Sequence, residues 1–277
     1  MKTLKEYAFS IVLFAAFEAV AVTLWLVLDD IFYLFNFTYI GACLALGTAL
    51  FSRRVSWARR AVQLAVGSYM LVYLGILCGE NMQLEGFWYY LFLGVFQAAV
   101  IHYAVAKLFG PLLFGRGWCG FACWTAMVLD FLPWKHPAKP RRKLRWPRYV
   151  LFFASLCYVA ALFAWKVPDL ERVMARSFLV GNALYYAVGI GLAWAFRDNR
   201  AFCKYVCPIT VFLKPMSKYS LTRVKVNPDK CLHCGKCKRV CPMEVDMLDP
   251  SRNRANGTEC ILCLECVQEC PGKALEL

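Results

Sequence analysis

The sequence is poor in charged residues and in histidine, and both shortages exclude classes of protein. Charged residues make up 18% of the 277-residue chain, against about 25% in a soluble domain, so the composition favours a membrane protein. The only histidines are His102, His136 and His233, and there is no Cys-x-x-Cys-His motif. A self-contained multihaem cytochrome is therefore excluded, because His102 alone cannot supply both axial ligands of a haem between membrane helices.

Nucleotide and flavin motifs and a catalytic acid–base constellation are also lacking. We therefore expect substrate turnover in a partner subunit, and whether this chain is itself an enzyme stays open. Acidic residues number 18 against 32 basic ones, giving a net charge of +14. A basic soluble surface would suggest nucleic-acid binding. Here the basic residues lie in short loops between apolar runs, so we expect no nucleic-acid partner.

Long apolar stretches account for most of the chain, which is 60% hydrophobic. Six of them are long enough to cross a bilayer as helices of roughly 20 residues: Tyr7–Leu28, Ile31–Phe51, Ala61–Leu77, Phe87–Ala106, Tyr149–Trp165 and Phe178–Phe196. The first is similar to a signal peptide, but its apolar run continues past the cleavage-like Ala19–Ala21. We therefore expect it to remain as a span.

Loop charges predict the orientation of these spans. The loop between the second and third spans carries Arg53, Arg54, Arg59 and Arg60 with no acidic residue, and segment 107–148 carries nine basic residues against Asp130 alone. Basic loops stay in the cytoplasm. Residues 1–214 are thus predicted to form an all-α domain of six transmembrane helices in a bacterial-type cytoplasmic (inner) membrane, with both termini inside.

Eight of the 15 cysteines form two runs of identical spacing near the C-terminus. In each run Cys-x2-Cys-x2-Cys-x3-Cys-Pro is the pattern of bacterial two-cluster ferredoxins, where the fourth cysteine ligates the other cluster. Two structural zinc sites are the alternative, although zinc sites usually pair two short cysteine knuckles. The pattern assigns two [4Fe–4S] clusters, one to Cys231, Cys234, Cys237 and Cys270 and the other to Cys260, Cys263, Cys266 and Cys241.

Residues 215–277 are expected to form a small cytoplasmic α+β domain of the bacterial 2[4Fe–4S] ferredoxin type. Leu221–Val226 alternates like a short strand, and Ala274–Leu277 is its expected partner. A segment this short cannot build a large apolar core, so metal clusters would have to organise it.

Four further cysteines form two pairs of equal spacing. GRGWCGFACW contains Cys119 and Cys123, and NRAFCKYVCP contains Cys203 and Cys207, each following an apolar span in what is similar to a two-fold repeat of membrane hairpins. On a helix this spacing puts both thiols on one face, so the two pairs predict a third iron–sulfur cluster, of [4Fe–4S] type, at the membrane boundary. Four unconnected buried thiols are the alternative. The remaining cysteines are expected to be packing residues: Cys43, Cys78 and Cys157.

With these motifs the chain resembles the NapH-type membrane polyferredoxins, the membrane component of 4Fe–4S quinol dehydrogenases. That family combines membrane spans, two cytoplasmic Cys-x3-Cys-Pro motifs and a C-terminal two-cluster ferredoxin module. The resemblance covers most of the chain from about residue 60 onward, and it implies a quinol-linked electron-transfer subunit beside a partner oxidoreductase. One residue departs from the family pattern: Trp124 follows the first pair where the family has proline, whereas Pro208 follows the second.

Four other residues are candidates for cofactor binding. Glu18 lies in the middle of the first span, where an ionisable side chain is costly; it would relay a quinol proton or, alternatively, be hydrogen-bonded between helices. His102 is a candidate for contact with a quinone head group or a cluster sulfur, the alternative being a buried, satisfied histidine. Arg116 and Arg200 precede their cysteine pairs and would compensate cluster charge or anchor helix ends at anionic lipid.

These observations predict a membrane electron-transfer subunit that passes electrons between a quinone pool or a membrane partner and cytoplasmic iron–sulfur clusters, within a larger oxidoreductase complex. Expected partners are other redox subunits (iron–sulfur, flavin or haem proteins), quinone and membrane lipid. A metal (copper) reductase or assembly factor is one alternative, although such proteins carry an additional domain after the ferredoxin module. A redox-sensing membrane anchor whose clusters do not turn over is another.

Overall fold

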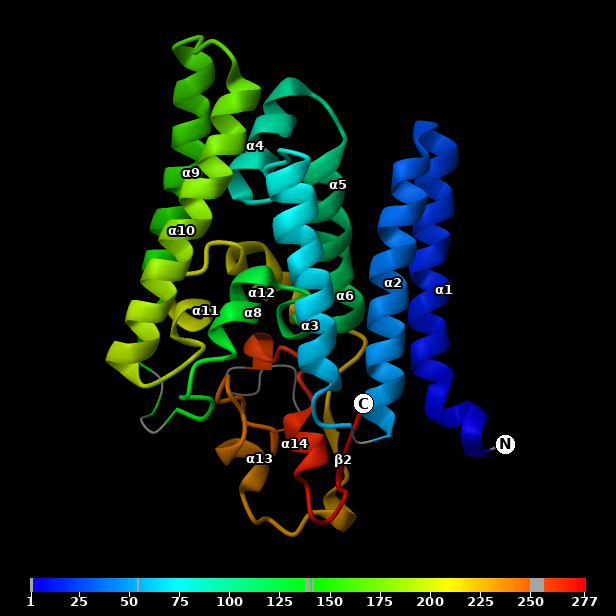
Figure 1. The fold of residues 1–277 in the computed structure, drawn as a ribbon. Coiled ribbons are helices and arrows are strands. Elements are labelled where there is room, and N and C mark those ends of the chain that lie inside the picture. Colours follow the sequence, from blue (N-terminus) through cyan, green and yellow to red (C-terminus); the bar gives the residue numbers. More distant parts are fainter. Residues whose placement is uncertain (1, 54, 138–139, 141, 250–256) are drawn as a thin grey trace.

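The chain is mostly helical. The computed structural model describes residues 2–53, 55–137, 140, 142–249 and 257–277, so Arg54 of the first basic loop lies outside the described residues. Figure 1 shows the long helices standing side by side, with the N- and C-termini at one end of the molecule. The elements up to residue 217 are α1 (Lys2–Leu28), α2 (Ile31–Ser52), α3 (Ala58–Ser68), η1 (Tyr69–Leu77), α4 (Leu84–Leu93), α5 (Ala98–Tyr103), η2 (Ala104–Phe109), α6 (Gly110–Phe114), α7 (Gly117–Phe121), α8 (Trp124–Leu129), α9 (Pro147–Ala164), α10 (Leu170–Phe196), α11 (Ala201–Tyr205) and α12 (Thr210–Ser217).

Within the described residues, five helical segments are long and apolar enough to cross a membrane. These are Tyr7–Leu28, Ile31–Phe51, Ala58–Leu77, Pro147–Ala164 and Leu170–Phe196. They correspond to five of the six predicted spans and support a membrane protein. Local signals begin two of them: the Asp30 side chain accepts a hydrogen bond from the Phe32 N–H at 2.8 Å at the start of α2, and Pro147 starts α9.

The predicted fourth span, Phe87–Ala106, is wrong as a single helix. Helix α4 ends at Leu93, because Gly94 adopts the left-handed conformation (φ +70°) and donates its N–H to the Leu91 carbonyl. The chain then restarts and forms a shorter apolar helix over Ala99–Phe114. Gly94 inside the apolar run is the signal of this break, since glycine populates left-handed backbone at little cost.

Among the residues that the structure describes, two segments have π-helical hydrogen bonding: η1, which completes the third span, and η2, which follows α5. π-Helical turns are rare and are found frequently at functional sites. Both segments border one cavity, to which η1 contributes Met70 and Leu74 and η2 contributes Val105 and Ala106.

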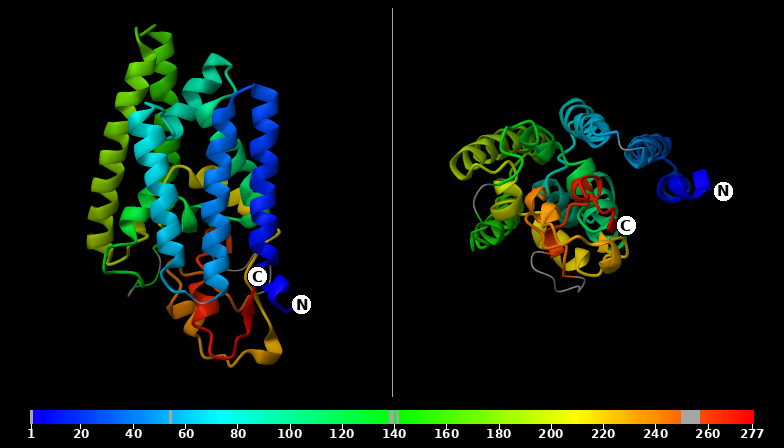
Figure 2. Two further views of the ribbon diagram at one scale, coloured as in Figure 1. Left: turned by 45° about the vertical axis from the view of Figure 1, so that its right-hand side comes forward. Right: turned by 90° about the horizontal axis from the view of Figure 1, so that it is seen from below.

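The C-terminal residues form a small module at the end of the molecule where both termini lie (Figures 1 and 2). Seen from below in Figure 2, the module lies under the middle of the helical domain, while α1 and α2 stand to one side. The predicted strand pair is confirmed in shorter form, with Val226 opposite Leu275 in an antiparallel ladder. The predicted boundary after residue 214 falls inside α12 and stays a prediction. The module's elements are β1 (Lys225–Val226), η3 (Pro228–Lys230), α13 (Lys236–Arg239), η4 (Gly257–Glu259), α14 (Glu265–Gln268) and β2 (Leu275–Glu276).

A shared hydrophobic core joins the module to the helical domain. Leu262 and Leu264 of the module are buried in one cluster with Cys119, Cys203 and Leu213. Burial of apolar area stabilises this junction without fixing its exact register. The register comes from ion pairs and a close backbone contact, which are described with the site.

Candidate metal centres

The first four cysteines assigned together by spacing converge in the structure. Cys231, Cys234, Cys237 and Cys270 line one small cavity, and we call them the first ferredoxin set. Three of them come from the loop before α13 and its first turn, and Cys270 comes from the other run, after α14. The crossover of the fourth cysteine is therefore present in the fold.

The other four module cysteines form the second ferredoxin set: Cys241, Cys260, Cys263 and Cys266. Cys241 of the first run interacts electrostatically with Cys260, and both Cys263 and Cys266 interact with Cys241. Burial raises the pKa of the Cys241 thiol to about 11, and burial likewise raises the pKa of Cys263 and Cys266. These thiols are protonated at neutral pH, so a bound metal must displace their protons.

The two ferredoxin runs have the same backbone shape. Left-handed residues occur at matching places in the runs: His233 and Leu262, then Gly235 and Leu264, then Glu244 and Lys273. The fourth thiol of each run also accepts an N–H four residues on, at 3.4 Å for Cys241 and 3.3 Å for Cys270. Left-handed leucines are uncommon. Their presence at two positions shows that the cysteine loops are held in a turn that favours convergence of the thiols.

The two Cys-x3-Cys pairs also adopt one shared local structure. In each, a five-residue helix (α7 or α11) carries the first cysteine and ends before the second. The N–H of Cys123 bonds to the Trp118 carbonyl at 3.1 Å, and that of Cys207 to the Phe202 carbonyl at 2.9 Å. The expectation that one helix face carries both thiols is therefore wrong, because the helix stops too early. The second thiol is placed instead by the turn that follows.

Folding brings both pairs together in the interior. Cys119, Cys123, Cys203 and Cys207 interact electrostatically with one another, and we call these four the boundary set. Cys119 and Cys203 are buried in the core that joins the module to the helices. The four thiols come from segments far apart in the sequence.

Three cationic side chains surround the boundary set. The Arg200 guanidinium donates to the Cys119 carbonyl at 3.2 Å and lies 3.9 Å from the Cys203 sulfur. Arg116 interacts electrostatically with the boundary thiols and is 1% exposed, so neither arginine anchors a helix at lipid. Lys107, which loop charge counting treats as a cytoplasmic marker, is also buried beside these thiols. A site lined by three cations suits a bound group of negative charge.

Buried ion pairs fix the module on the helical domain, and Glu259 makes the first group. Its carboxylate pairs with Arg116, with Lys214 at 2.5 Å and with Arg148 at 3.7 Å. Glu259, Arg116 and Arg148 are each 1% exposed. A charge buried to this extent needs its partner, because breaking such a pair leaves an uncompensated charge in a low-dielectric interior.

A second group contains Glu265 of the module, which pairs with Arg59 of α3 at 3.1 Å. Arg59 and Arg200 share the Asp130 carboxylate at 2.8 and 2.6 Å. Burial alone would raise the pKa of Asp130, but Arg200 and Arg59 hold it below its ordinary value. Asp130 is thus an anion that orients one arginine toward the module and another toward the boundary set.

The third group centres on Lys204, which follows Cys203 and is fully buried. Its ammonium pairs with Asp198 and with Glu244 of the module, both at 2.7 Å. Together the three groups give the module three separate acidic contacts with bases of the helical domain. Sequence reasoning missed all three, since nothing in the local pattern pairs residues this far apart.

One backbone contact places the boundary set next to the second ferredoxin set. A β-carbon added at Gly120 would lie 2.3 Å from the Ile261 carbonyl oxygen, so only glycine fits there. Gly120 stands between Cys119 and Cys123, and Ile261 stands between Cys260 and Cys263. The two thiol sets are therefore adjacent across the junction.

Trp124, the departure from the family pattern, occupies the first position of α8. The preceding Cys123 is extended (φ −73°, ψ 118°), the backbone that a following proline requires. The buried indole donates to the Asn182 side chain at 2.8 Å, and the Trp124 carbonyl accepts from Tyr186 at 3.3 Å. Tryptophan thus keeps a backbone that suits proline and adds an anchor to α10.

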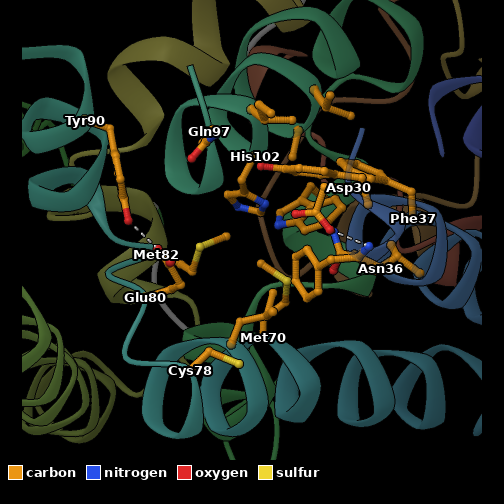
Figure 3. Close-up of a pocket in the computed structure, with 18 residues that line it drawn as sticks. Asp30, Asn36, Phe37, Met70, Cys78, Glu80, Met82, Tyr90, Gln97 and His102 are labelled. Carbon is orange, nitrogen blue, oxygen red and sulfur yellow. Dashed lines mark hydrogen bonds between the residues drawn. The ribbon is translucent and has the colours of Figure 1, made fainter. Parts of the chain in front are cut away.

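The two remaining candidates lie in different surroundings. Glu18 accepts a hydrogen bond from Thr38 of α2 at 3.2 Å with one oxygen, while its other oxygen has no partner. His102 is buried with an unpartnered Nε2 and packs edge-on against Trp118, with ring centroids 5.2 Å apart. Figure 3 shows its ring facing a cavity, across from Met82 and Glu80. The structure brings His102 close to the boundary set and leaves Glu18 outside it.

All three sets consist of thiols, which is the donor chemistry of iron–sulfur clusters and also of zinc or copper(I). In the part of the chain that the structure describes, no three His, Cys, Asp or Glu side chains converge closely enough for a single metal ion. Thiolates around a cubane stand farther apart than around one ion, because the cubane is itself several atoms wide.

Two family models match the chain. One, described as a 4Fe–4S dicluster domain, matches residues 223–271 and so covers both ferredoxin runs. The other, described as a 4Fe–4S binding domain, matches residues 88–147 and 183–227, the segments that contain the two Cys-x3-Cys pairs.

Curated relatives point the same way. The chain is 29% identical over 153 residues to the methylamine utilization ferredoxin-type protein MauN of Paracoccus denitrificans, covering 52% of this chain and 54% of the relative. It is 26% identical over 157 residues to the ferredoxin-type protein NapH of Haemophilus influenzae, covering 53% and 54%. It is 32% identical over 102 residues to the putative electron transport protein YccM of Escherichia coli, covering 35% and 29%. The chain thus spans about half the length of the MauN and NapH relatives it matches, and no solved structure is a significant match.

Thiol sets in a ferredoxin module and in an apolar helical domain, matched by two 4Fe–4S family models, define the class: a membrane iron–sulfur protein of ferredoxin type. Its relatives have names of ferredoxin-type and electron transport proteins, which supports an electron-transfer role. The relatives include NapH and MauN ferredoxin-type proteins, so the resemblance to NapH-type polyferredoxins seen in the sequence is confirmed.

Proposed function

We propose that this chain is a membrane electron-transfer subunit of a larger oxidoreductase complex, linking a quinone pool to cytoplasmic [4Fe–4S] clusters. The first ferredoxin set, the second ferredoxin set and the boundary set would each hold one cluster. When bound, the clusters supply one-electron storage and transfer. The rest of the proposal concerns what this chain's residues do around them.

The observation that carries the proposal is the contact between Gly120 and Ile261. It brings the loop between the boundary thiols against the loop between two thiols of the second ferredoxin set. Three sets in a row, from the apolar domain into the module, form a continuous route for electrons. An ordinary structural role for the thiols would not need this succession.

The charged residues hold that route in place. Lys107, Arg116 and Arg200 compensate negative charge at the boundary set. Glu259, Glu265 and Glu244 dock the module, so that its second set stays against the boundary set. Because the basic loops lie at the end of the molecule that carries the module, we place that end in the cytoplasm.

Iron and acid-labile sulfide counting tests the three-cluster assignment. In a Cys203→Ser/Cys207→Ser double variant we expect the loss of one cluster with two retained, because the ferredoxin sets lie in a separate module. Cys157→Ser is the matched control, since this exposed thiol of α9 belongs to no set. An unchanged iron content in the double variant would contradict the assignment of a cluster to the boundary set.

Stopped-flow reduction tests the quinone link. Purified wild-type protein, alone and with copurifying subunits, is mixed with a soluble quinol analogue, and cluster bleaching is followed in the visible range. Reduction by the quinol supports the proposal. Clusters that accept electrons from dithionite but from no quinol, with or without the subunits, would contradict the quinone link while leaving electron transfer intact.

A further inference from the structure

A cavity of about 280 Å³ lies inside the helical domain, between α2, η1 and α5. Its lining begins with Asp30 at the α1–α2 turn, at the end of the molecule opposite the module, and reaches Trp118 in the interior. The volume is close to the lower limit of small-molecule sites, roughly 300 Å³. It suits a single ring system better than a long ligand.

Two side chains that line this cavity and pack against each other, with ring centroids 5.2 Å apart, each have an unpartnered polar atom. His102 is 7% exposed and its Nε2 has no hydrogen-bond partner, and the Trp118 Nε1, also buried, has none either. Both side chains line the cavity. A buried polar group without a partner costs free energy, so an acceptor and a donor left open on two packed side chains are suited to a ligand that has an oxygen and a hydroxyl hydrogen.

The Trp118 end of the cavity adjoins the boundary set. Trp118 immediately precedes Cys119, and its ring lies under the Lys107 ammonium at 4.9 Å from the ring centroid. A ring bound against His102 and Trp118 would thus lie one residue from a boundary thiol.

The outer end of the cavity has a carboxylate. Glu80 accepts a hydrogen bond from Tyr90 at 2.8 Å, and the two residues line both this cavity and a hollow on the far surface that includes Asp169 and Glu171. Burial raises the pKa of Glu80, an effect that the Tyr90 hydrogen bond opposes. Glu80 therefore stands where a proton would pass from the cavity to the surface opposite the module.

We propose that this cavity binds the head group of a membrane quinol. His102 Nε2 accepts the proton of one hydroxyl group, and the Trp118 N–H donates a hydrogen bond to the other oxygen of the ring. The assignment rests on the proposed function. In the oxidation both quinol O–H bonds would break, and two electrons would leave one at a time. The [4Fe–4S] clusters would be the oxidant, and quinone would be the product. The two protons leave past Glu80, so that protons and electrons depart to opposite ends of the protein.

Two other cavities fit this role less well. An apolar one shares Trp118 but has Thr48 as its single polar side chain, so it offers no proton acceptor. A groove beside α9 and α10 contains the half-buried Glu85 but contains neither His102 nor Trp118. Binding of the quinol in either of these cavities is an outcome that the labelling experiment below can identify.

The test uses cluster-loaded protein in nanodiscs and a photoreactive azidoquinone, with the labelled peptides mapped by mass spectrometry. We expect label within residues 70–82 and 97–106. His102→Gln should lower the quinol-driven rate of cluster reduction by about 10²-fold while dithionite reduction and iron content stay unchanged. His136→Gln, at an exposed loop histidine, is the matched control and should behave as wild type.

A second variant covers the case in which His102→Gln does not fold. Ala106→Phe fills the cavity with His102 intact and should abolish labelling, whereas Ala160→Phe on an exposed face of α9 should not. Labelling at the Glu85 groove or the apolar cavity, or unchanged quinol kinetics in His102→Gln, overturns the assignment. If wild type takes neither label nor electrons from quinol, the proposed function fails instead.

The proton route has its own readout. In proteoliposomes with the module facing outward, quinol oxidation by an external electron acceptor of the module should acidify the lumen. Proton release into the outer medium would overturn the exit past Glu80.

Discussion

Glu259 offers the most direct test of how the module is held. Glu259→Gln keeps the shape of the side chain but removes its charge, and Arg116 and Arg148 then stay buried without the Glu259 carboxylate. Lys214 is 22% exposed and can turn to water, so the cost falls on the two arginines. Breaking a buried pair of this kind costs about 3–5 kcal/mol.

Hydrogen exchange measures this cost where it acts. If the module opens by undocking, amides within Ile261–Cys266 exchange through that opening, and the expected loss of docking energy accelerates them roughly 10²- to 4 × 10³-fold. Glu269→Gln is the matched control, since Glu269 pairs with Lys236 at 2.7 Å in the same module but on its exposed surface. Solvent screens that pair, so its loss should change little. Exchange in Glu259→Gln that is no faster than in Glu269→Gln would refute the docking role of the buried carboxylate.

Three more predictions follow from the junction. Gly120→Ala places a β-carbon against the Ile261 carbonyl and should weaken the magnetic coupling between neighbouring clusters seen by EPR. Gly117→Ala is the control, since the nearest atom to its added β-carbon would be 3.6 Å away. Equal EPR spectra for the two variants would contradict the contact. Trp124→Pro should retain all iron, because the backbone suits proline. It should lower the melting temperature, because removal of the buried indole costs about 3–5 kcal/mol of folding free energy. Loss of iron would show that the indole is needed for the cluster. Lys107→Met removes a positive charge beside the boundary thiols and should lower the reduction potential of the boundary cluster in a redox titration. Lys166→Met is the control, because Lys166 is exposed and outside the site. An unchanged potential in Lys107→Met would contradict charge compensation by this lysine.

The cysteine sets could be assigned from the sequence because most of their geometry is local, and their role as cluster ligands stays a prediction. Spacing within a ferredoxin run places three thiols on one loop, and the shared spacing of the two runs implies their crossover. Cys241 and Cys270 accordingly lie with the opposite runs. The Cys-x3-Cys pairs converge as expected, although each helix ends before its second cysteine.

Other features depend on tertiary contacts that no local pattern contains. Lys107 was counted among loop charges, yet it is buried, because the chain folds it against the boundary thiols. Glu259 and Glu265 are ordinary module acids until their basic partners come into place. The prediction of one continuous helix for the fourth span is wrong at Gly94, because the left-handed backbone of this residue ends α4 inside a long apolar run.

The three acidic contacts of the module have a consequence for biogenesis. Until the module docks, Arg116 and Arg148 lack the Glu259 carboxylate and Lys204 lacks that of Glu244, and the module cannot take its shape before its cysteine loops close around metal. Cluster insertion therefore precedes the last step of membrane-domain folding. A cell short of iron would accumulate an open, unstable helical domain that quality-control proteases can recognise, so that iron supply limits the amount of protein as well as its redox activity.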